Sequence, residues 1–204
     1  MIVAVTGTIG SGKSVVAHYL ASLLQAEYCD ADLLCRDLMK KHKPGWQQVR
    51  AQWKDRFLTD GESIDRVKLR EAVFHDTGVR KKLEAILHPL VYTAIQEKVA
   101  GCVAQGKNFV VEIPLLFETN KQKEFEHVVT VFARPESCVE RIMLRDSVSR
   151  KQALKALESQ MDIDTKVKGS DFVIDNSASL AETKRQVEDL SRLLLKGLHS
   201  KNQP

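Results

Sequence analysis

Residues 7–14 have the sequence Gly7-Thr8-Ile9-Gly10-Ser11-Gly12-Lys13-Ser14. This segment matches the pattern Gly-x4-Gly-Lys-Ser/Thr in full, which is the phosphate-binding loop (P-loop) pattern. Its glycines let the backbone curl so that successive N–H groups point at phosphate oxygens. The apolar run at residues 2–6 predicts a buried strand, and residues 14–24 predict a helix whose N-terminus adds positive potential. The sequence therefore predicts a nucleoside triphosphate site at the start of the chain.

Two side chains of this loop carry specific expectations. Lys13 is expected to reach the β- and γ-phosphates, and the hydroxyl of Ser14 is expected to ligate Mg²⁺. We expect the nucleotide contacts of this segment to run from Gly7 through Val15. The ligands implied are ATP and Mg²⁺.

Further apolar runs alternate with longer amphipathic stretches. Residues 109–113, 128–132 and 172–174 predict buried strands, and a short segment at 27–29 predicts a further one. This alternation predicts an α/β fold, a P-loop NTPase-type core in which helices flank a parallel β-sheet. Residues 180–198 have apolar positions at helical spacing and are expected to pack back on the sheet.

Two polar, helical stretches interrupt the core. Residues 33–104 predict a helical insertion, with turns at Pro44-Gly45 and Asp60-Gly61. Residues 134–168 predict a second helical stretch, in which Ser149 and Gln152 form a capping box for a helix that reaches residue 160. The domain prediction is a core of residues 1–32, 105–140 and 169–204, an acceptor-binding insertion of residues 33–104, and a lid of residues 141–168.

Composition limits the class of protein. The chain has 204 residues, of which 43% are hydrophobic and 28% charged, as expected of a globular domain. A net charge of +4 is too small for a histone-like or RNA-coating protein but suits a local cationic site. The four cysteines lack Cys-x-x-Cys spacing, and we find no signal peptide and no apolar run of about 20 residues. We expect a reduced, soluble, cytoplasmic protein.

Among P-loop proteins the sequence favours a kinase of small molecules. A GTPase should carry an Asn-Lys-x-Asp guanine reader, and none is present. A motor ATPase has a strand that ends in an acid, and residues 109–112, which end at Glu112, could imitate one. The motor interpretation is therefore weakened and not excluded.

A kinase also needs a carboxylate at the acceptor hydroxyl and cations that neutralise the transferring phosphoryl group. Asp30 and Asp32 follow the second predicted strand, at the sheet edge where ligands bind in such folds. Arg141, Arg145 and Arg150 belong to the predicted lid region. Simpler interpretations stay open at this point: either aspartate could cap the next helix, and the arginines could form a solvated helix face.

Short blocks beyond the loop form an ordered set that covers nearly the whole chain, through about residue 187. They are Asp30-Ala31-Asp32 with Arg36, Asp60-Gly61, Ile64-Asp65-Arg66, Leu69, Val73-Phe74, Leu83-Glu84, Leu87-His88-Pro89-Leu90, Pro114-Leu115-Leu116-Phe117-Glu118, Arg141, Arg145-Asp146 and Val173-Ile174-Asp175-Asn176. With the loop, this set resembles the dephospho-CoA kinases. The His-Pro and Pro-Leu-Leu-Phe-Glu blocks are the most specific, because many families share the loop.

The resemblance implies transfer of the γ-phosphoryl group of ATP to the ribose 3′-hydroxyl of dephospho-CoA, the last step of coenzyme A synthesis. It implies roles for residues outside the loop. Asp32 would be the catalytic carboxylate, Arg141 and Arg145 would join Lys13 in stabilising phosphate charge, and Arg36 and His88 would contact the acceptor. Asn176 would lie near the adenine of ATP.

Some assignments have alternatives. His88 precedes Pro89 and could simply mark a helix end, and Asn176 could be a turn residue. Thr8 stands where the family commonly has a second glycine, so the loop must tolerate a β-branched residue there. Glu112 stands where the family often has Asp; a strand-end acid bonded to loop N–H groups is the preferred interpretation over a metal ligand.

Other functions remain to be weighed. The alternative enzyme is a nucleoside or nucleoside-monophosphate kinase on the same core. The non-enzyme alternative is a nucleotide-gated interaction or nucleic-acid-binding module. The sequence lacks a Lys/Arg stripe with interleaved aromatic residues, so we expect no nucleic acid partner. We expect no membrane partner, and a monomer or weak homo-oligomer.

Overall fold

The structure is a computed structural model that describes the backbone of residues 1–201 and the side chains of residues 1–197. Residues 202–204, which end the predicted core segment, lie outside the described residues, as does the side chain at position 198 of the predicted tail helix. The chain divides into two compact units, one formed by Met1–Cys29 with Gly101–Pro204 and the other by Asp30–Ala100.

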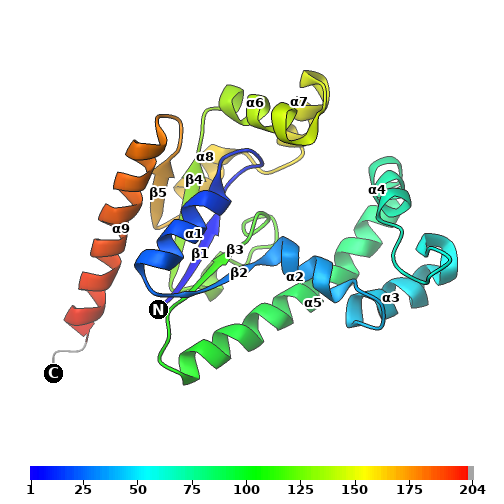
Figure 1. Cartoon of the computed structure of the whole chain (residues 1–204), viewed down its shortest axis with the longest axis horizontal. Helices are drawn as coiled ribbons and strands as arrows, with labels where there is room; N and C mark the ends of the chain where they lie inside the picture. Colours follow the sequence, from blue (N-terminus) through cyan, green and yellow to red (C-terminus); the bar gives the residue numbers. More distant parts are fainter. Residues whose placement is uncertain (202–204) are drawn as a thin grey trace. The chain divides into compact units, whose positions relative to one another are not determined.

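A five-stranded sheet forms the centre of the first unit, in the order β2-β3-β1-β4-β5 (Figure 1). The pairs β1–β3, β1–β4 and β4–β5 are parallel. The predicted parallel sheet is therefore confirmed, and each predicted strand is present to within one residue at either end. The strands are β1 (Ile2–Thr6), β2 (Glu27–Asp30), β3 (Phe109–Glu112), β4 (His127–Phe132) and β5 (Phe172–Asp175).

Helices α1 (Lys13–Leu23) and α9 (Leu180–Lys201) pack on this sheet and on each other (Figure 1). Their apolar stripes share one core with the central strands, which includes Leu20 of α1, Leu190 of α9 and Val129 of β4. All residues of β1 and β3 are buried, so these strands read as continuous apolar runs and not as alternating patterns. The predicted tail helix is confirmed.

The stretch before β5 contains α6 (Pro135–Asp146), α7 (Arg150–Glu158) and α8 (Ile163–Lys168). Ser149 and Gln152 form the predicted capping box at the start of α7, which ends two residues earlier than expected. Apolar contacts of Val139 and Ile142 with Ala153 join α6 to α7. A short 3-10 turn, η2 (Gln122–Glu124), follows β3.

The unit Asp30–Ala100 is helical, as predicted. Trp46, Val49 and Phe57 belong to its own small core, and the Trp46 indole N–H donates to the carbonyl of Glu62 at 2.6 Å. Leu58 and Ile64 form an isolated antiparallel bridge. The elements are α2 (Ala31–Leu38), α3 (Pro44–Trp53), η1 (Lys54–Phe57), α4 (Arg66–His75) and α5 (Thr77–Ala104), whose last residues belong to the first unit.

The alternative interpretation of His88 as a helix end is wrong. Helix α5 continues through Pro89, so His88 lies inside a 28-residue helix with its side chain exposed. Proline removes one backbone donor from a helix but does not always end it, because neighbouring groups can satisfy the released carbonyl. His88 therefore presents a side chain on a helix surface.

The described residues include four cysteines, and no two of them are joined in a disulfide. Burial raises the pKa of the Cys138 thiol, in spite of the nearby charges of Arg141 and Lys13. Among the helices of residues 1–201, none combines the length and apolar character that crossing a membrane requires.

Candidate phosphate-binding site

The loop of residues 7–14 connects β1 to α1 and requires glycine at two of its turns. Gly10 and Gly12 have φ angles of 79° and 85°, in the left-handed region that disfavours other residues. A Cβ atom on Gly10 would lie 2.6 Å from the carbonyl oxygen of Cys138, and one on Gly12 would collide with the side-chain amide of Asn176. The loop is thus seated tightly against the segments that follow β4 and β5.

Helix α1 begins with its first turn uncapped by any side chain. Gly12 occupies the cap position and has no side chain to offer, and the first turn carries no acidic residue. A helix N-terminus with free N–H groups attracts anions. The local structure therefore supports phosphate binding at the start of α1.

Thr8 fits the loop without the glycine that the family commonly has there. Its φ angle is not among the positive values described for residues 1–201, so the β-branched side chain meets no backbone strain. The side chain is buried, with its hydroxyl 4.0 Å from the thiol of Cys138. The departure at Thr8 is therefore accommodated by contact with α6.

Arg141 and Asn176 hold the loop through its carbonyl groups. The Arg141 guanidinium donates to the carbonyls of Gly10 at 3.2 Å and Ser11 at 3.4 Å, and to that of Asn176 at 3.0 Å. Asn176 Nδ2 donates to the Ser11 carbonyl at 2.7 Å, while its Oδ1 accepts from Thr183 at 2.8 Å. Arg141 is thus not part of a solvated helix face, and Asn176 is bonded to the loop.

A cavity of about 230 Å³ lies against the loop. Three side chains that were predicted to contact phosphate line it, together with the hydroxyl of Ser14, which was predicted to bind metal. Clustered cations on uncapped backbone N–H groups favour a polyphosphate. The lining residues are Gly10, Gly12, Lys13, Ser14, Arg141 and Arg145.

Arg145 is engaged by its neighbour Asp146. The guanidinium donates from Nε at 2.9 Å and from Nη2 at 2.8 Å to the two carboxylate oxygens of Asp146. These hydrogen bonds raise the pKa of Arg145. The pair lies on an exposed helix end, where such ion pairs contribute little to stability. A phosphate group at Arg145 would compete with Asp146 for the same guanidinium.

Glu112 connects the loop to β3 and β2. Its Oε1 accepts from the Ser14 hydroxyl at 2.8 Å, and its Oε2 accepts from the Tyr28 hydroxyl at 2.8 Å. Both bonds come from side-chain hydroxyls, and not from the loop N–H groups that the preferred interpretation predicted. That interpretation of Glu112 is corrected here: the pleated register that pairs Val5 with Glu112 brings the carboxylate beside the loop.

Ser14 and Glu112 fit a magnesium ion by their chemistry. Mg²⁺ prefers oxygen ligands and takes one or two from the protein, with phosphates and waters completing the shell. Within the described residues no three His, Cys, Asp or Glu side chains form a cage. A hydroxyl and one carboxylate beside the loop therefore match a metal that arrives with a nucleotide.

Asp32, Arg36 and His88 lie in the unit Asp30–Ala100. The cap of α2 is Asp30, whose Oδ1 accepts from the N–H groups of Asp32 at 2.8 Å and Leu33 at 3.0 Å. The side chain of Asp32 is consequently not the helix cap; it lies in the exposed first turn, four residues before Arg36. Their roles toward a substrate remain predictions.

Charges near Cys35 show which of these side chains lie together. Burial raises the pKa of the Cys35 thiol, as does the charge of Asp32, whereas the charges of Arg36 and Arg66 lower it. The charges of Asp32, Arg36 and Arg66 thus all act on this one thiol. Sequence reasoning gave Arg66 no role, although it belongs to a block that carries the family resemblance.

Tyr28 and Gln160 are two further residues that sequence reasoning missed. Tyr28 bonds to Glu112, 84 positions away, and the side chain of Gln160 bonds to the N–H group of Ile9, 151 positions away. Neither residue belongs to a local motif, so no spacing rule could have found it.

The parallel sheet, the loop between β1 and α1, and the arginines of a helical segment beside it define the class of the protein as a P-loop kinase. The family model for dephospho-CoA kinase matches residues 1–182. The chain belongs to the dephospho-CoA kinase family.

Individual relatives agree with this assignment. The chain is 37% identical over 188 residues to a dephospho-CoA kinase of Desulfotalea psychrophila, covering 92% of this chain and 94% of the relative. Among solved structures, the dephospho-CoA kinase from Campylobacter jejuni has a TM-score of 0.71 at 29% identity. The alignment covers 96% of this chain and 98% of the Campylobacter chain. A Thermus thermophilus protein has a TM-score of 0.75 at 30% identity, over 100% of this chain and 98% of its own.

Proposed function

We propose that this protein transfers the γ-phosphoryl group of ATP to the ribose 3′-hydroxyl of dephospho-CoA, giving coenzyme A and ADP. The observation that carries the proposal is the family match over residues 1–182, which spans both the loop and the helical unit. The cationic cavity at Lys13, Arg141 and Arg145 supports it, because phosphoryl transfer depends on positioning and on neutralising phosphate charge.

The triphosphate would lie along the loop and the uncapped start of α1. Lys13 would contact the β- and γ-phosphates, and Arg145 would leave Asp146 to meet the transferring group. Arg141 would act mainly by holding the loop carbonyls of Gly10 and Ser11, and Asn176 would fix the same turn close to the adenine. Residues 141–168 are the proposed lid, whose closure excludes water and so favours transfer to the acceptor over hydrolysis.

Magnesium would be held by the Ser14 hydroxyl, with Glu112 as its neighbour. When bound, the ion neutralises charge on the β- and γ-phosphates. Glu112 accepts a hydrogen bond from the Ser14 hydroxyl, so the lone pairs of the serine oxygen face away from Oε1. Tyr28 holds the other carboxylate oxygen.

The acceptor would bind to residues 33–104. Asp32 would orient the 3′-hydroxyl and accept its proton, and Arg36 and His88 would contact the acceptor. The charges of Arg36 and Arg66 both act on Cys35 near Asp32, which supports this role for the start of the unit, because two guanidinium groups suit the phosphates of dephospho-CoA.

An acceptor panel tests the proposal. Purified protein with Mg·ATP should convert dephospho-CoA to coenzyme A, and should leave nucleosides and nucleoside monophosphates largely unchanged. Good turnover of a nucleoside monophosphate without turnover of dephospho-CoA would favour the alternative kinase. Salt-sensitive RNA binding at physiological salt would favour the nucleic-acid module instead.

Two variants test the roles within the reaction. Asp32→Asn should lower kcat by about 10²-fold or more with little change in ATP affinity, because it removes the proton acceptor and leaves the loop intact. Lys13→Ala should weaken ATP binding and also lower kcat. Wild-type kcat in Asp32→Asn would remove that residue from the catalytic group.

We further propose that the protein works in the cytoplasm on small molecules, as a monomer or weak homo-oligomer, without a nucleic acid or membrane partner. Four cysteines without a disulfide among them support a reducing compartment. Sedimentation of the purified protein across a concentration series measures the oligomeric state.

A further inference from the structure

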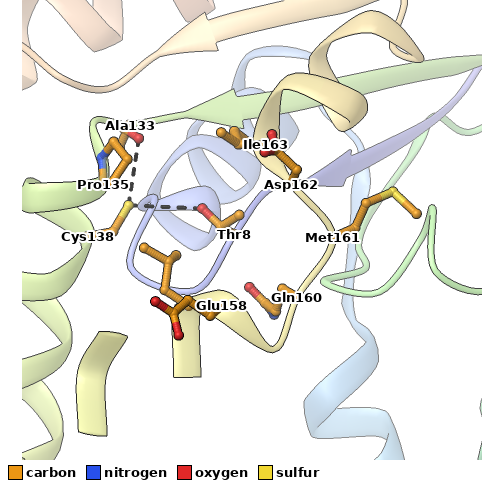
Figure 2. Close-up of a pocket in the computed structure, with 10 residues that line it drawn as sticks. Thr8, Ala133, Pro135, Cys138, Glu158, Gln160, Met161, Asp162 and Ile163 are labelled. Carbon is orange, nitrogen blue, oxygen red and sulfur yellow. Dashed lines mark hydrogen bonds between the residues drawn. The ribbon is translucent and has the colours of Figure 1, made fainter. Parts of the chain in front are cut away.

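Gln160 connects the segment between α7 and α8 to the phosphate-binding loop. Its Oε1 accepts a hydrogen bond from the backbone N–H of Ile9 at 2.6 Å. Figure 2 shows Gln160 and Thr8 around a cavity of about 310 Å³ that lies beside the loop.

This contact differs in kind from the others that hold the loop. Arg141 and Asn176 donate hydrogen bonds to loop carbonyls. A phosphate needs donors and cannot bind carbonyl oxygens, so these two contacts do not compete with it. Gln160 instead accepts from a loop N–H group, which is the type of donor that phosphates use. Its effect on nucleotide binding therefore needs its own explanation.

The segment that carries Gln160 is held firmly on its other side. The N–H of the next residue, Met161, donates to Glu118 Oε1 at 3.1 Å. Glu118 is paired with the fully buried Lys166 at 2.8 Å, and Lys166 also donates to the Pro114 carbonyl at 2.9 Å. Lys166 is fully buried while the Glu118 side chain is 22% exposed, and separating the two would leave the buried Lys166 charge uncompensated. The segment that carries Gln160 is thus held in place independently of the contact with Ile9.

We propose that Gln160 is a positioning residue for nucleotide binding: it holds the Ile9 amide so that the loop has its phosphate-binding shape before ATP arrives. A preorganised loop gives tighter binding because less conformational entropy is lost on association. This assigns a role to the Pro-Leu-Leu-Phe-Glu block, because Glu118 and Pro114 hold the segment that carries Gln160 through Met161 and Lys166. The inference rests on the proposed use of ATP and is independent of which acceptor is phosphorylated.

The test uses Gln160→Met, which keeps the side-chain length and removes the acceptor oxygen. Calorimetry without acceptor should show ATP binding weakened about 3- to 10-fold, the equivalent of one hydrogen bond. Amide hydrogen exchange of residues 7–14 should become faster in the nucleotide-free protein. The melting temperature should stay unchanged, and kcat should stay within about twofold, because the contact is made before and during transfer.

Two matched variants separate positioning from general damage. Gln152→Met removes a similar bond, since Gln152 Oε1 accepts from the Ser149 N–H at 2.9 Å, and it should change neither ATP affinity nor loop exchange. Gln160→Glu retains an acceptor, so loop exchange in the nucleotide-free protein should return to the wild-type rate.

Three results would overturn the inference. One is unchanged affinity and unchanged loop exchange in Gln160→Met. Another is tighter ATP binding, which would mean that Gln160 competes with phosphate for the Ile9 amide. The third is an equal loss in Gln152→Met, which would mean general damage to the α7 segment. Failure of wild-type protein to bind ATP would instead refute the proposed function.

Discussion

The hydroxyl of Ser14 donates a 2.8 Å hydrogen bond to Oε1 of Glu112, which joins the first turn of α1 to the last residue of β3. Parallel pairing of β1 with β3 brings these residues together, because both strands end at the same sheet edge. The pair supplies two kinds of oxygen that suit Mg²⁺ beside the phosphate-binding loop.

Glu112→Gln should therefore raise the Mg²⁺ concentration needed for tight nucleotide binding. We expect a shift of about 10-fold, because partners that orient a metal ligand typically contribute that much to metal affinity. Calorimetry of ATP binding over a Mg²⁺ series measures it. ATP binding without Mg²⁺ should not weaken, since a negative charge beside the phosphates has been removed. Identical Mg²⁺ dependence in the variant and wild type would contradict the assignment.

Tyr28→Phe should produce the same shift at reduced size, about 3-fold, because one hydrogen bond to the Glu112 carboxylate is lost. The ring remains, and with it the contact to His18 at a centroid distance of 3.9 Å. The control is Tyr19→Phe, which removes the 2.6 Å bond from the Tyr19 hydroxyl to Glu188. That control should leave the Mg²⁺ dependence unchanged, and a shift of equal size in both variants would refute the coupling.

Asn176→Asp should weaken ATP binding by about 10-fold or more. The change replaces the amide donor with a carboxylate that faces the Ser11 carbonyl, where Nδ2 now donates at 2.7 Å. Asn108→Asp is the matched control, because Asn108 Nδ2 donates at 2.8 Å to the Leu24 carbonyl beyond the other end of α1. Titration of ATP into each protein distinguishes them. If ATP binding weakens equally in both variants, the loss comes from a less stable α1 and the prediction for Asn176 is contradicted.

Lys166→Met should lower the free energy of unfolding by about 3 kcal/mol, because it leaves the Glu118 carboxylate without its buried partner. Adding Glu118→Gln should recover part of that loss. Lys121→Met disrupts the exposed pair with Glu124 and should cost less than about 1 kcal/mol. Urea unfolding of the four proteins gives the values, and a loss for Lys166→Met no greater than for Lys121→Met would contradict the role of the buried pair.

Much of the fold was predictable, because its signals are local. Residues 7–14 form a pattern whose geometry depends on adjacent residues, and the buried strands are short continuous apolar runs. The capping box at Ser149 and Gln152 was found for the same reason, since its partners are three residues apart. The interpretation of His88 and Pro89 as a helix end failed, because proline lowers helical stability locally without always ending the helix, and α5 continues to Ala104.

The sequence by itself determined the loop, the parallel core and the family resemblance, all of which rest on residue order and short-range spacing. Only the tertiary structure decided how the loop is held: Arg141 and Asn176 on its carbonyls, Gln160 on the Ile9 amide, and Tyr28 on Glu112. These contacts join segments that are 84 to 165 residues apart in the chain. Such separations leave no periodic trace, because the contacts arise from strand order and helix packing.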